Sequence, residues 1–361
     1  MNVENLKGLF PKTEKEIRRN FKTIEGEIRN SSEYLDNILF PRESCTSLSV
    51  AIENHFKQFL PANYRNRYAG GQYLNTLEKI QYQLVSLAHK GNTKNLDKRS
   101  LDWLTMGMIE PAERWARYFG SVAEMVAALV QAVYIRNNIE CSELITTGTL
   151  TTTDGEVLDI PFDSIDRTDQ ASGIVFHTEH AMFASNGSVN NDFDILAMFE
   201  SIKEARTTAG GRAPVKAIMN PVTWQGFWKN EDLNRYFQGF QNPAYFLKWR
   251  EQDESIQLPA GIQPVIYDKT YYLENPEASV KGKTPGVPVK YIPDHVIVFV
   301  PGRVGTRFVG PNDNIKNPSP NIFVDTWESP DGKTLTTEVG EASLPIPDDL
   351  NSLHIAYVKD R

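Results

Sequence analysis

Two histidines and a carboxylate fall within four residues, at His177, Glu179 and His180, and side chains of these types could bind zinc. The zinc-protease motif needs histidines at i and i+4, with a glutamate beside the first. Here the histidines are three residues apart, and Glu179 directly precedes the second. The preceding Gly-Ile-Val-Phe favours a strand, where residues three apart point to opposite faces. We therefore expect a strand and no metal site.

Two other segments could contact phosphate or a cation. Residues 302–306 (Gly-Arg-Val-Gly-Thr) lack the spacing and the Lys-Ser/Thr ending of a phosphate-binding loop. A turn after an apolar strand is the better interpretation. Four aspartates spaced four, three and three residues apart lack the calcium-loop pattern, which favours a solvated loop. These aspartates are Asp159, Asp163, Asp166 and Asp169.

No nucleophile-elbow motif occurs, and Cys141 falls within a helical pattern. The sequence thus predicts no catalytic, cofactor-binding or metal-ligating residue and a protein that is not an enzyme. The alternative is a soluble enzyme whose site is assembled from dispersed residues.

The composition of the 361 residues, with 40% hydrophobic and 23% charged, is that of a folded protein. The net charge of −8 argues against non-specific DNA binding by the whole surface. No stretch reaches 18 apolar residues, and the first 20 residues do not resemble a secretory signal. Because the two cysteines, Cys45 and Cys141, are far apart, we expect a reducing cytoplasm.

Three elements fit a solitary globular molecule poorly. Residues 12–29 form a charged amphipathic pattern, with Ile17, Phe21, Ile24 and Ile28 on one stripe; this predicts either a solvated surface helix or a mobile arm that docks on a partner. Residues 66–100 predict a polar extended hairpin. Residues 121–146 predict a long helix that begins at a Ser121–Glu124 capping box and stops near Gly148.

The rest of the chain alternates β and α patterns. Residues 149–165 read as β structure with a turn at Asp154–Gly155. Asp194 caps a helix, and Asn220 caps another that has Pro221 at its first position. Strands are predicted at 215–219, 262–267, 296–300 and 354–358. Nine aromatic residues crowd into 224–249, where they fill a domain core or form contacts between subunits.

Several of these segments, taken in order, resemble the lambda-like phage major capsid protein E family. The matching segments are ECSELITTGTLTTTDGEVLDIPF (140–162), DILAMFESIKEARTTAGGRAPVKAIMNPVTWQGFWKNEDLNRYF (194–237), GIQPVIYDKTYY (261–272), IPDHVIVFVPGRVGTRFVGP (292–311) and the stretch from Asp325 to Val358. NILFPRESCTSLSVAI (37–52) is more loosely similar. The region 53–120 is less recognisable, and Glu110 to Phe119 adds what we interpret as an extra helix turn.

The resemblance implies an α+β protein with the Hong Kong 97-type capsid fold. In that fold, residues 1–33 would be the N-terminal arm, 34–65 the first part of the P-domain and 66–100 the E-loop. Residues 101–212 would hold the spine helix and P-domain, 213–335 the A-domain, and 336–361 a C-terminal strand segment.

The resemblance also implies a function, the major capsid protein of a tailed double-stranded DNA bacteriophage. Its copies would form pentamers and hexamers of an icosahedral shell that encloses DNA without sequence-specific binding. We expect a separate scaffolding protein and a portal, room for a decoration protein, no membrane, and assembly in the host bacterial cytoplasm. An encapsulin-like compartment of the same fold is the alternative.

Some capsids of this fold crosslink a lysine to an asparagine through a glutamate. Lys90, Lys94 and Lys98 lie in the predicted E-loop. Because lysines are common in exposed loops and lambda-like relatives do without the crosslink, we expect none.

Overall fold

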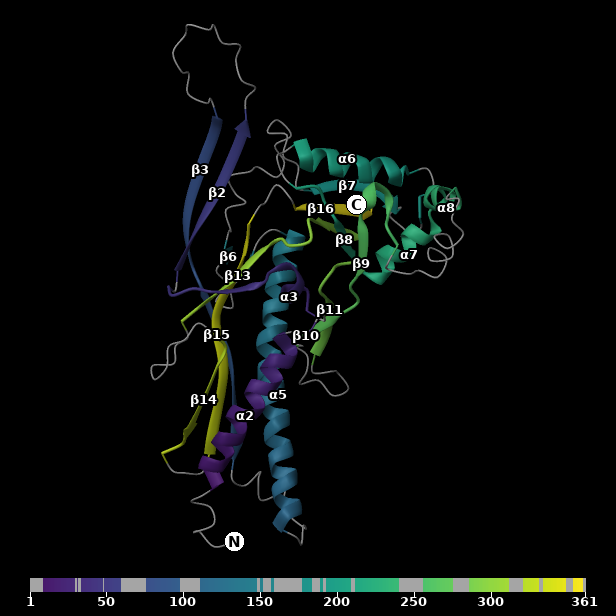
Figure 1. Cartoon of the computed structure of the whole chain (residues 1–361). Helices are drawn as coiled ribbons and strands as arrows, with labels where there is room; N and C mark the ends of the chain where they lie inside the picture. Colours follow the sequence, from purple (N-terminus) through teal and green to yellow (C-terminus); the bar gives the residue numbers. More distant parts are fainter. Residues whose placement is uncertain are drawn as a thin grey trace, which may run out of the picture. The chain divides into compact units, whose positions relative to one another are not determined.

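The structure is a computed structural model, and Figure 1 traces the chain. It describes residues 9–29, 31, 34–47, 49–59, 76–97, 111–147, 150–151, 157–158, 177–183, 189–190, 193–208, 212–239, 256–274, 286–311, 321–330, 334–348 and 353–359. The chain divides into two compact units, each built from separate segments. The first unit comprises Met1–Val50, Ser86–Cys141 and Thr306–Ile346, and the second comprises Ala51–Val85, Ser142–Gly305 and Pro347–Arg361.

The first unit is built on a mixed sheet and on helices from the N-terminal half of the chain. Its helices are α2 (Leu9–Arg29), α3 (Leu35–Leu39) and most of α5 (Pro111–Thr147). Its strands are β1 (Arg42–Ser44), β4 (Ala88–Asp97), β13 (Gly305–Gly310), β14 (Phe323–Glu328) and β15 (Thr334–Pro347). The sheet runs in the order β1-β13-β15-β14, and β4 also pairs with β15.

Strand β15 is the centre of this sheet. It pairs antiparallel with β4 from Thr334↔Asp97 to Ser343↔Ala88, and antiparallel with β14 from Leu335↔Glu328 to Gly340↔Phe323. Strand β1 pairs parallel with β13, and this register sets Arg42 opposite Arg307. A parallel pair requires a long connection, so distant parts of the sequence meet in this sheet.

An apolar core joins α2, α5 and the strands of the first unit. Ile17 and Phe21 of α2 pack with Val126 and Val130 of α5, and Val339 of β15 completes the cluster. The predicted apolar stripe of α2 is therefore confirmed. In this structure the stripe packs against its own chain, so α2 is neither fully solvated nor detached.

The second unit has a five-stranded mixed sheet in the order β7-β16-β12-β8-β9. These strands are β7 (His177–Phe183), β16 (His354–Lys359), β12 (Val296–Val300), β8 (Lys216–Met219) and β9 (Gln263–Ile266). Helices α6 (Ile195–Thr208), α7 (Pro221–Lys229) and α8 (Glu231–Gln238) and the short helix η2 (Pro259–Gly261) accompany it. Two-stranded pairs form between β2 (Ser49–Phe59) and β3 (Thr76–Ser86), between β5 (Leu150–Thr151) and β6 (Val157–Leu158), and between β10 (Thr270–Glu274) and β11 (Gly286–Lys290).

Apolar side chains from helices and strands form the core of the second unit. Phe199 of α6 lies edge-on to Phe227 of α7 and to Phe299 of β12, with ring centroids 5.9 and 5.5 Å apart. At Gly226 of α7 an added Cβ would lie 1.9 Å from Cζ of Phe183, so only glycine permits this contact. The helices therefore pack closely on the sheet.

The predicted helix starts of the second unit are confirmed. The Asp194 carboxylate accepts a hydrogen bond from the backbone N–H of Ala197 at 2.9 Å. The Asn220 side chain accepts one from the Thr223 N–H at 2.9 Å, and Pro221 follows as the first residue of α7. These contacts satisfy N–H groups that a helix leaves without an intrahelical partner. The short β5–β6 pair confirms β structure after residue 148, while its predicted turn lies outside the described residues.

Two predictions about the N-terminal half are wrong in detail. Helix α5 begins at Pro111 and runs for 37 residues, so Ser121 and Glu124 lie inside it and form no cap. Proline fits there because a first-turn N–H has no helical partner. The strands in the predicted hairpin at 66–100 do not pair with each other, because β3 pairs with β2 and β4 pairs with β15.

Candidate functional site

Two of the segments that could have carried chemistry lie in a strand and in a turn. His177 and Glu179 lie on β7, which pairs parallel with β16, so the predicted strand is confirmed. Gly302 has a φ of +100° between β12 and β13, as expected of a glycine turn. The four aspartates at 159–169 lie outside the described residues. Within the residues that are described, no group of three metal-ligating side chains comes together.

The aromatic segment is divided between core and surface. Trp224, Phe227 and Phe237 are buried in the core of the second unit, whereas Tyr236 on α8 is 36% exposed. The aromatic residues of this segment that follow residue 239 lie outside the described part of the chain. The segment therefore contributes to the core of the second unit, and its contact with other subunits stays a prediction.

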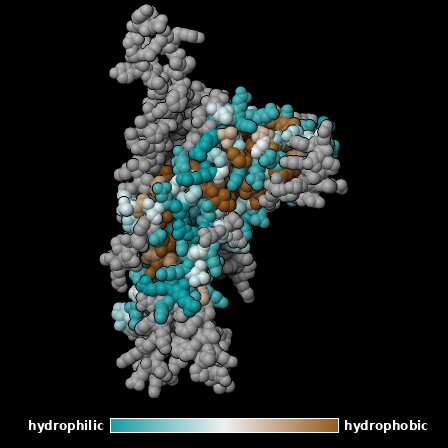
Figure 2. All heavy atoms as spheres, in the orientation of Figure 1, coloured by the Kyte–Doolittle hydropathy of each residue, from teal (hydrophilic) through white to brown (hydrophobic). Residues whose placement is uncertain are grey.

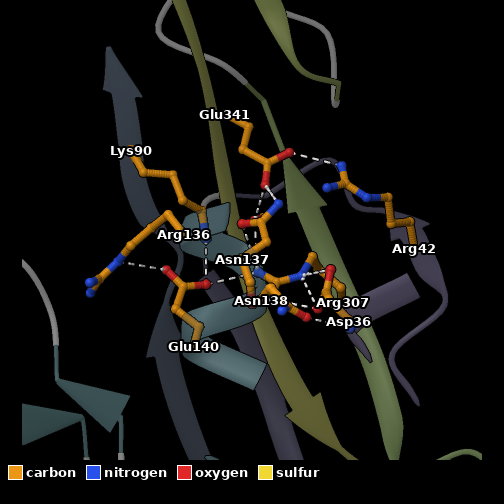
Figure 3. Close-up of polar contacts among 10 residues, drawn as sticks. Asp36, Arg42, Lys90, Arg136, Asn137, Asn138, Glu140, Arg307 and Glu341 are labelled. Atoms are coloured by element: carbon orange, nitrogen blue, oxygen red, sulfur yellow. Dashed lines mark hydrogen bonds and ion pairs between the residues drawn. The ribbon is translucent and has the colours of Figure 1, made fainter. Parts of the chain in front are cut away.

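The most unusual site in the described chain is a buried cluster of charged residues in the first unit (Figure 3). Six elements contribute to it, namely α3, β1, β4, α5, β13 and β15. We define the ionic cluster as three cations, three carboxylates and the polar groups between them. The members are Asp36, Arg42, Lys90, Asn137, Glu140, Arg307, Glu341 and Ser343.

Arg307 of β13 lies at the centre of the ionic cluster and has no exposed surface. Its Nε donates to both carboxylate oxygens of Asp36, at 2.7 and 2.9 Å. Its Nη1 donates to Oε2 of Glu140 at 2.9 Å, and its Nη2 donates to the backbone carbonyl of Asn137 at 2.9 Å. One planar guanidinium thus connects α3 to α5 through bonds that fit its fork of donors.

Glu341 of β15 organises the second part of the cluster. Its Oε2 accepts from Nη1 of Arg42 at 2.8 Å. Its Oε1 accepts from Nδ2 of Asn137 at 2.6 Å and from the hydroxyl of Ser343 at 2.7 Å. The guanidinium of Arg42 also lies over the ring of Tyr134, 4.6 Å from its centroid, a favourable cation–π position.

Glu140 of α5 joins β4 to the cluster. Its Oε2 accepts from Nζ of Lys90 at 2.5 Å, and its Oε1 lies 3.7 Å from Nε of Arg136 one helical turn earlier. The three carboxylates of the cluster, those of Asp36, Glu140 and Glu341, have six oxygens in all. Each of these oxygens has at least one donor nitrogen or hydroxyl of the chain nearby. The cluster is therefore charge-balanced, and its carboxylates have the donors that buried ions need. Nε and Nη2 of Arg42 are buried without a hydrogen-bond partner.

Burial and neighbouring charge oppose each other in the pKa values of the cluster. Burial alone would raise the pKa of Glu341, but Arg42, Lys90 and Arg307 outweigh it and lower that pKa to about 2. Burial would likewise raise the pKa of Glu140, yet Lys90 and Arg307 lower it. Burial raises the pKa of Asp36, and Arg307 only partly offsets this. Burial also lowers the pKa of Lys90 against the attraction of Glu140.

Sequence reasoning missed this cluster, although α5 carried one signal. Asn137, Asn138 and Glu140 interrupt an otherwise apolar stretch of the helix and are all buried. Buried polar residues in such a helix require partners. The partners could not be named, because Arg307 and Asp36 are 271 positions apart.

The three lysines of the predicted E-loop, which were considered for a crosslink, differ in their surroundings. Lys90 is held by Glu140 inside the first unit, and Lys94 is exposed on β4. Lys98 lies outside the described residues. Cys45 and Cys141 are both free thiols, and Cys141 is buried. Among the described helices, none is both long and apolar enough to cross a bilayer.

Known proteins resemble this chain in sequence and in structure. A sequence model of the family described as "Phage major capsid protein E" matches residues 23–358. The capsid of a native GTA particle has a similar structure, with a TM-score of 0.50, 12% identity, and coverage of 92% of this chain and 91% of that chain. A search of curated proteins finds no match.

Two further solved structures are similar over most of their length. The mature capsid of bacteriophage PhiM1 shares 11% identity with a TM-score of 0.45, and covers 88% of this chain and 84% of that chain. A phage-related protein from Bordetella bronchiseptica RB50 shares 12% identity with a TM-score of 0.46, at 93% and 96% coverage. On the family match, this chain belongs to the phage major capsid protein E family and has the α+β Hong Kong 97-type fold of a tailed-phage major capsid protein.

Proposed function

We propose that copies of this chain associate as pentamers and hexamers and close into the icosahedral head that encloses double-stranded DNA. The observation that carries the proposal is the family match from residue 23 to residue 358, which spans both units. A virion protein must act as a building block, and a rigid first unit suits that task. The ionic cluster provides this rigidity because it fixes six elements at one point.

The β2–β3 ribbon is the element through which we propose that one copy reaches the next. Its strands are 11 residues each, and each pairs with the other alone among the described strands. An isolated two-stranded ribbon is marginally stable in water. Contact with a neighbouring copy would stabilise it, and strands of two chains can pair along their edges.

The remaining partners also belong to this proposal. We propose that a separate scaffolding protein and a portal take part in assembly in the host cytoplasm, and that a decoration protein can bind the finished head.

We further propose that the shell is not crosslinked and that the chain catalyses no reaction. Lys90 supports the first point because its ammonium is already engaged by Glu140. Boiling assembled particles in SDS tests it, since a ladder of covalent oligomers would refute it.

The content of purified particles tests the proposed function. Particles from phage-producing cells are treated with nuclease, separated by sedimentation and analysed for protected DNA. The proposal predicts that this chain co-sediments with protected double-stranded DNA. Shells that hold proteins and no DNA would instead indicate a compartment of the encapsulin kind. A monomer of 40.9 kDa that turns over a substrate would indicate a dispersed enzyme site.

A further inference from the structure

The β10–β11 ribbon carries the two most exposed large apolar side chains among the described residues. On β10, Tyr272 is 71% exposed and Leu273 is 52% exposed, and Val287 on β11 is 44% exposed. We call these three residues the ribbon tip. Much of the described surface on the face drawn in Figure 2 is hydrophilic. Adjacent apolar side chains that are exposed to this degree indicate a surface that a partner covers.

The register of the ribbon places the tip on both of its faces. Leu273 lies directly opposite Val287, and Tyr272 lies directly opposite Pro288; Figure 1 shows the two strands side by side. Successive side chains of a strand point to opposite faces, so Leu273 and Val287 share one face and Tyr272 lies on the other. A single flat surface could cover only one of these faces. The tip therefore fits a partner that receives the ribbon on both sides.

The base of the ribbon is held by its own unit. Tyr291, directly after β11, is 5% exposed, and its ring centroid lies 4.9 Å from that of Tyr271 and 5.9 Å from that of Tyr267. The hydroxyl of Ser142 donates to the backbone carbonyl of Tyr291. The tip is thus presented from an anchored base, which reduces the entropy that a partner must remove on binding.

Charge on the ribbon lies at its base among the side chains that the structure describes. Lys290 is the one charged residue of these, and its Nζ donates to Oδ1 of Asp294 at 2.6 Å. The whole chain has a net charge of −8, so two copies repel each other through their overall fields. An uncharged tip allows contact between copies without this repulsion, and the centres of interfaces are poor in charge and rich in tyrosine.

We infer that the ribbon tip inserts into a second copy of this chain during assembly. This inference rests on the proposed function, in which copies associate into a shell. Three side chains supply only part of the about 800 Å² that each partner of a stable complex buries. The tip is therefore too small to hold a dimer by itself. It suits a shell in which each copy makes several weak contacts at once.

The test compares full-length variants that lose the same apolar surface at different places. In the tip variant, Leu273→Thr and Val287→Thr keep residues that favour strands. In the control variant, Val215 and Val222 become Thr; they are exposed apolar residues of the same unit, at 50% and 39%. A Leu273→Ile/Val287→Ile variant keeps the tip apolar. Light scattering, with scaffolding protein supplied, measures the protein concentration needed for half-maximal assembly.

The tip variant is expected to raise this concentration by roughly tenfold or more, because every copy loses two apolar contacts. The control variant and the isoleucine variant are expected to assemble like the wild type. Thermal unfolding of the soluble subunits confirms that each variant is folded. Equal effects in the tip and control variants, or normal assembly of the tip variant, would overturn the inference.

Chemical labelling of the tip identifies what covers it. In a Cys45→Ser background, Tyr272→Cys places an accessible thiol at the tip, while Cys141 is buried. We expect a maleimide to modify this thiol roughly tenfold or more slowly in finished shells than in soluble subunits, as expected of a side chain buried at an interface. Equal rates would contradict the inference. Protection that ends when the scaffolding protein leaves the shell would identify that protein as the partner, and the inference would be wrong.

Failure of the inference and failure of the proposed function give different results. If shells form and the tip variant assembles normally, the inference fails while the proposed function stands. If the wild type forms no shells, the proposed function fails, and chemical crosslinking of soluble subunits at high concentration then decides the role of the tip. Oligomers that the tip variant loses would support the inference, and equal crosslinking of both proteins would overturn it.

Discussion

Buried polar side chains gather in one ionic cluster in the first unit, whereas in the second unit they form separate hydrogen bonds, at helix starts or to single carbonyl groups such as that of Leu353, which accepts from Nη1 of Arg206. Arg307 reaches Asp36 across 271 positions of sequence, whereas Asn220 and Asn230 each bond an N–H three residues ahead, at the starts of α7 and α8. The apolar core of the second unit, around Phe199 and Phe299, does not depend on such ions. The two units should therefore fail for different reasons, and the ionic cluster should matter only to the first.

The largest expected effect is the loss of Arg307. Arg307→Met leaves Asp36 and Glu140 buried with fewer partners, which costs about 3–5 kcal/mol. Cys141 is buried in the first unit, so its modification by a thiol reagent in a Cys45→Ser background reports the opening of that unit. We expect modification to become more than a hundredfold faster.

The matched control is Arg235→Met, which removes an exposed arginine of α8 and should cost less than about 1 kcal/mol. Similar rates of Cys141 modification in the two variants would show that the ionic cluster does not hold the first unit together. A variant with Asp36, Lys90, Glu140 and Arg307 all replaced by apolar residues removes two charges of each sign and should recover much of the loss.

Acid should weaken the first unit through Glu341. Its folded pKa of about 2 lies below the ordinary value of 4.5. A lowered carboxyl pKa gives stability that is present above the unfolded value and is lost as pH falls through the folded value. The window is therefore from about pH 4.5 down to about pH 2, with on the order of 3 kcal/mol at stake.

Urea titrations at a series of pH values, monitored by Cys141 accessibility with an acid-tolerant disulfide reagent, measure this loss. Glu341→Gln should be less stable than the wild type at neutral pH and should show a smaller decline in this window. An equal decline in both proteins would assign the acid sensitivity to other groups.

One substitution, Gly→Ala, should have opposite effects in the two units. At Gly226 the new Cβ would lie 1.9 Å from Phe183, and such overpacking costs about 1–3 kcal/mol. At Gly26 of α2 nothing lies within 4 Å, so Gly26→Ala should stabilise the helix by about 0.5–1 kcal/mol. Thermal unfolding of both variants checks the signs, and a stabilised Gly226→Ala would contradict the close packing of α7 on β7.

The smallest expected loss of stability among these core positions concerns the local polar contacts of the second unit. Asn220→Ala removes the side-chain cap of α7 and should cost about 1 kcal/mol. The Asn220 side chain also bonds Asp294, so Asn220→Asp, which keeps the capping oxygen but opposes Asp294, separates the two contributions. If Asn220→Asp is as stable as the wild type, the cap is the dominant contribution.

This contrast also explains what could be predicted from the sequence. The caps at Asp194 and Asn220 and the apolar stripe of α2 depend on neighbours within one or two turns, and these predictions are confirmed. Strand partners depend on distant segments, so the pairing of β4 with β15 was not foreseen. The start of α5 was placed at Ser121 because Ser121 and Glu124 fit a capping box, although Trp115, Tyr118 and Phe119 continue the helical spacing toward Pro111.

The ionic cluster was not predicted from the sequence. Asn137, Asn138 and Glu140 marked a polar interruption in α5, yet their partners lie on β13 and β15, beyond the reach of local pattern. The family of the chain was instead identified from the order of several motifs along the sequence. The family match over residues 23–358 confirms this identification.

The central claim is that this chain is a shell-forming subunit, and electron cryomicroscopy of the purified full-length protein at high concentration tests it most directly. We predict closed shells built from pentamers and hexamers, with α5 and the β2–β3 ribbon resolved in every subunit. Monomers that stay dispersed at high concentration, with scaffolding protein supplied, would contradict the account.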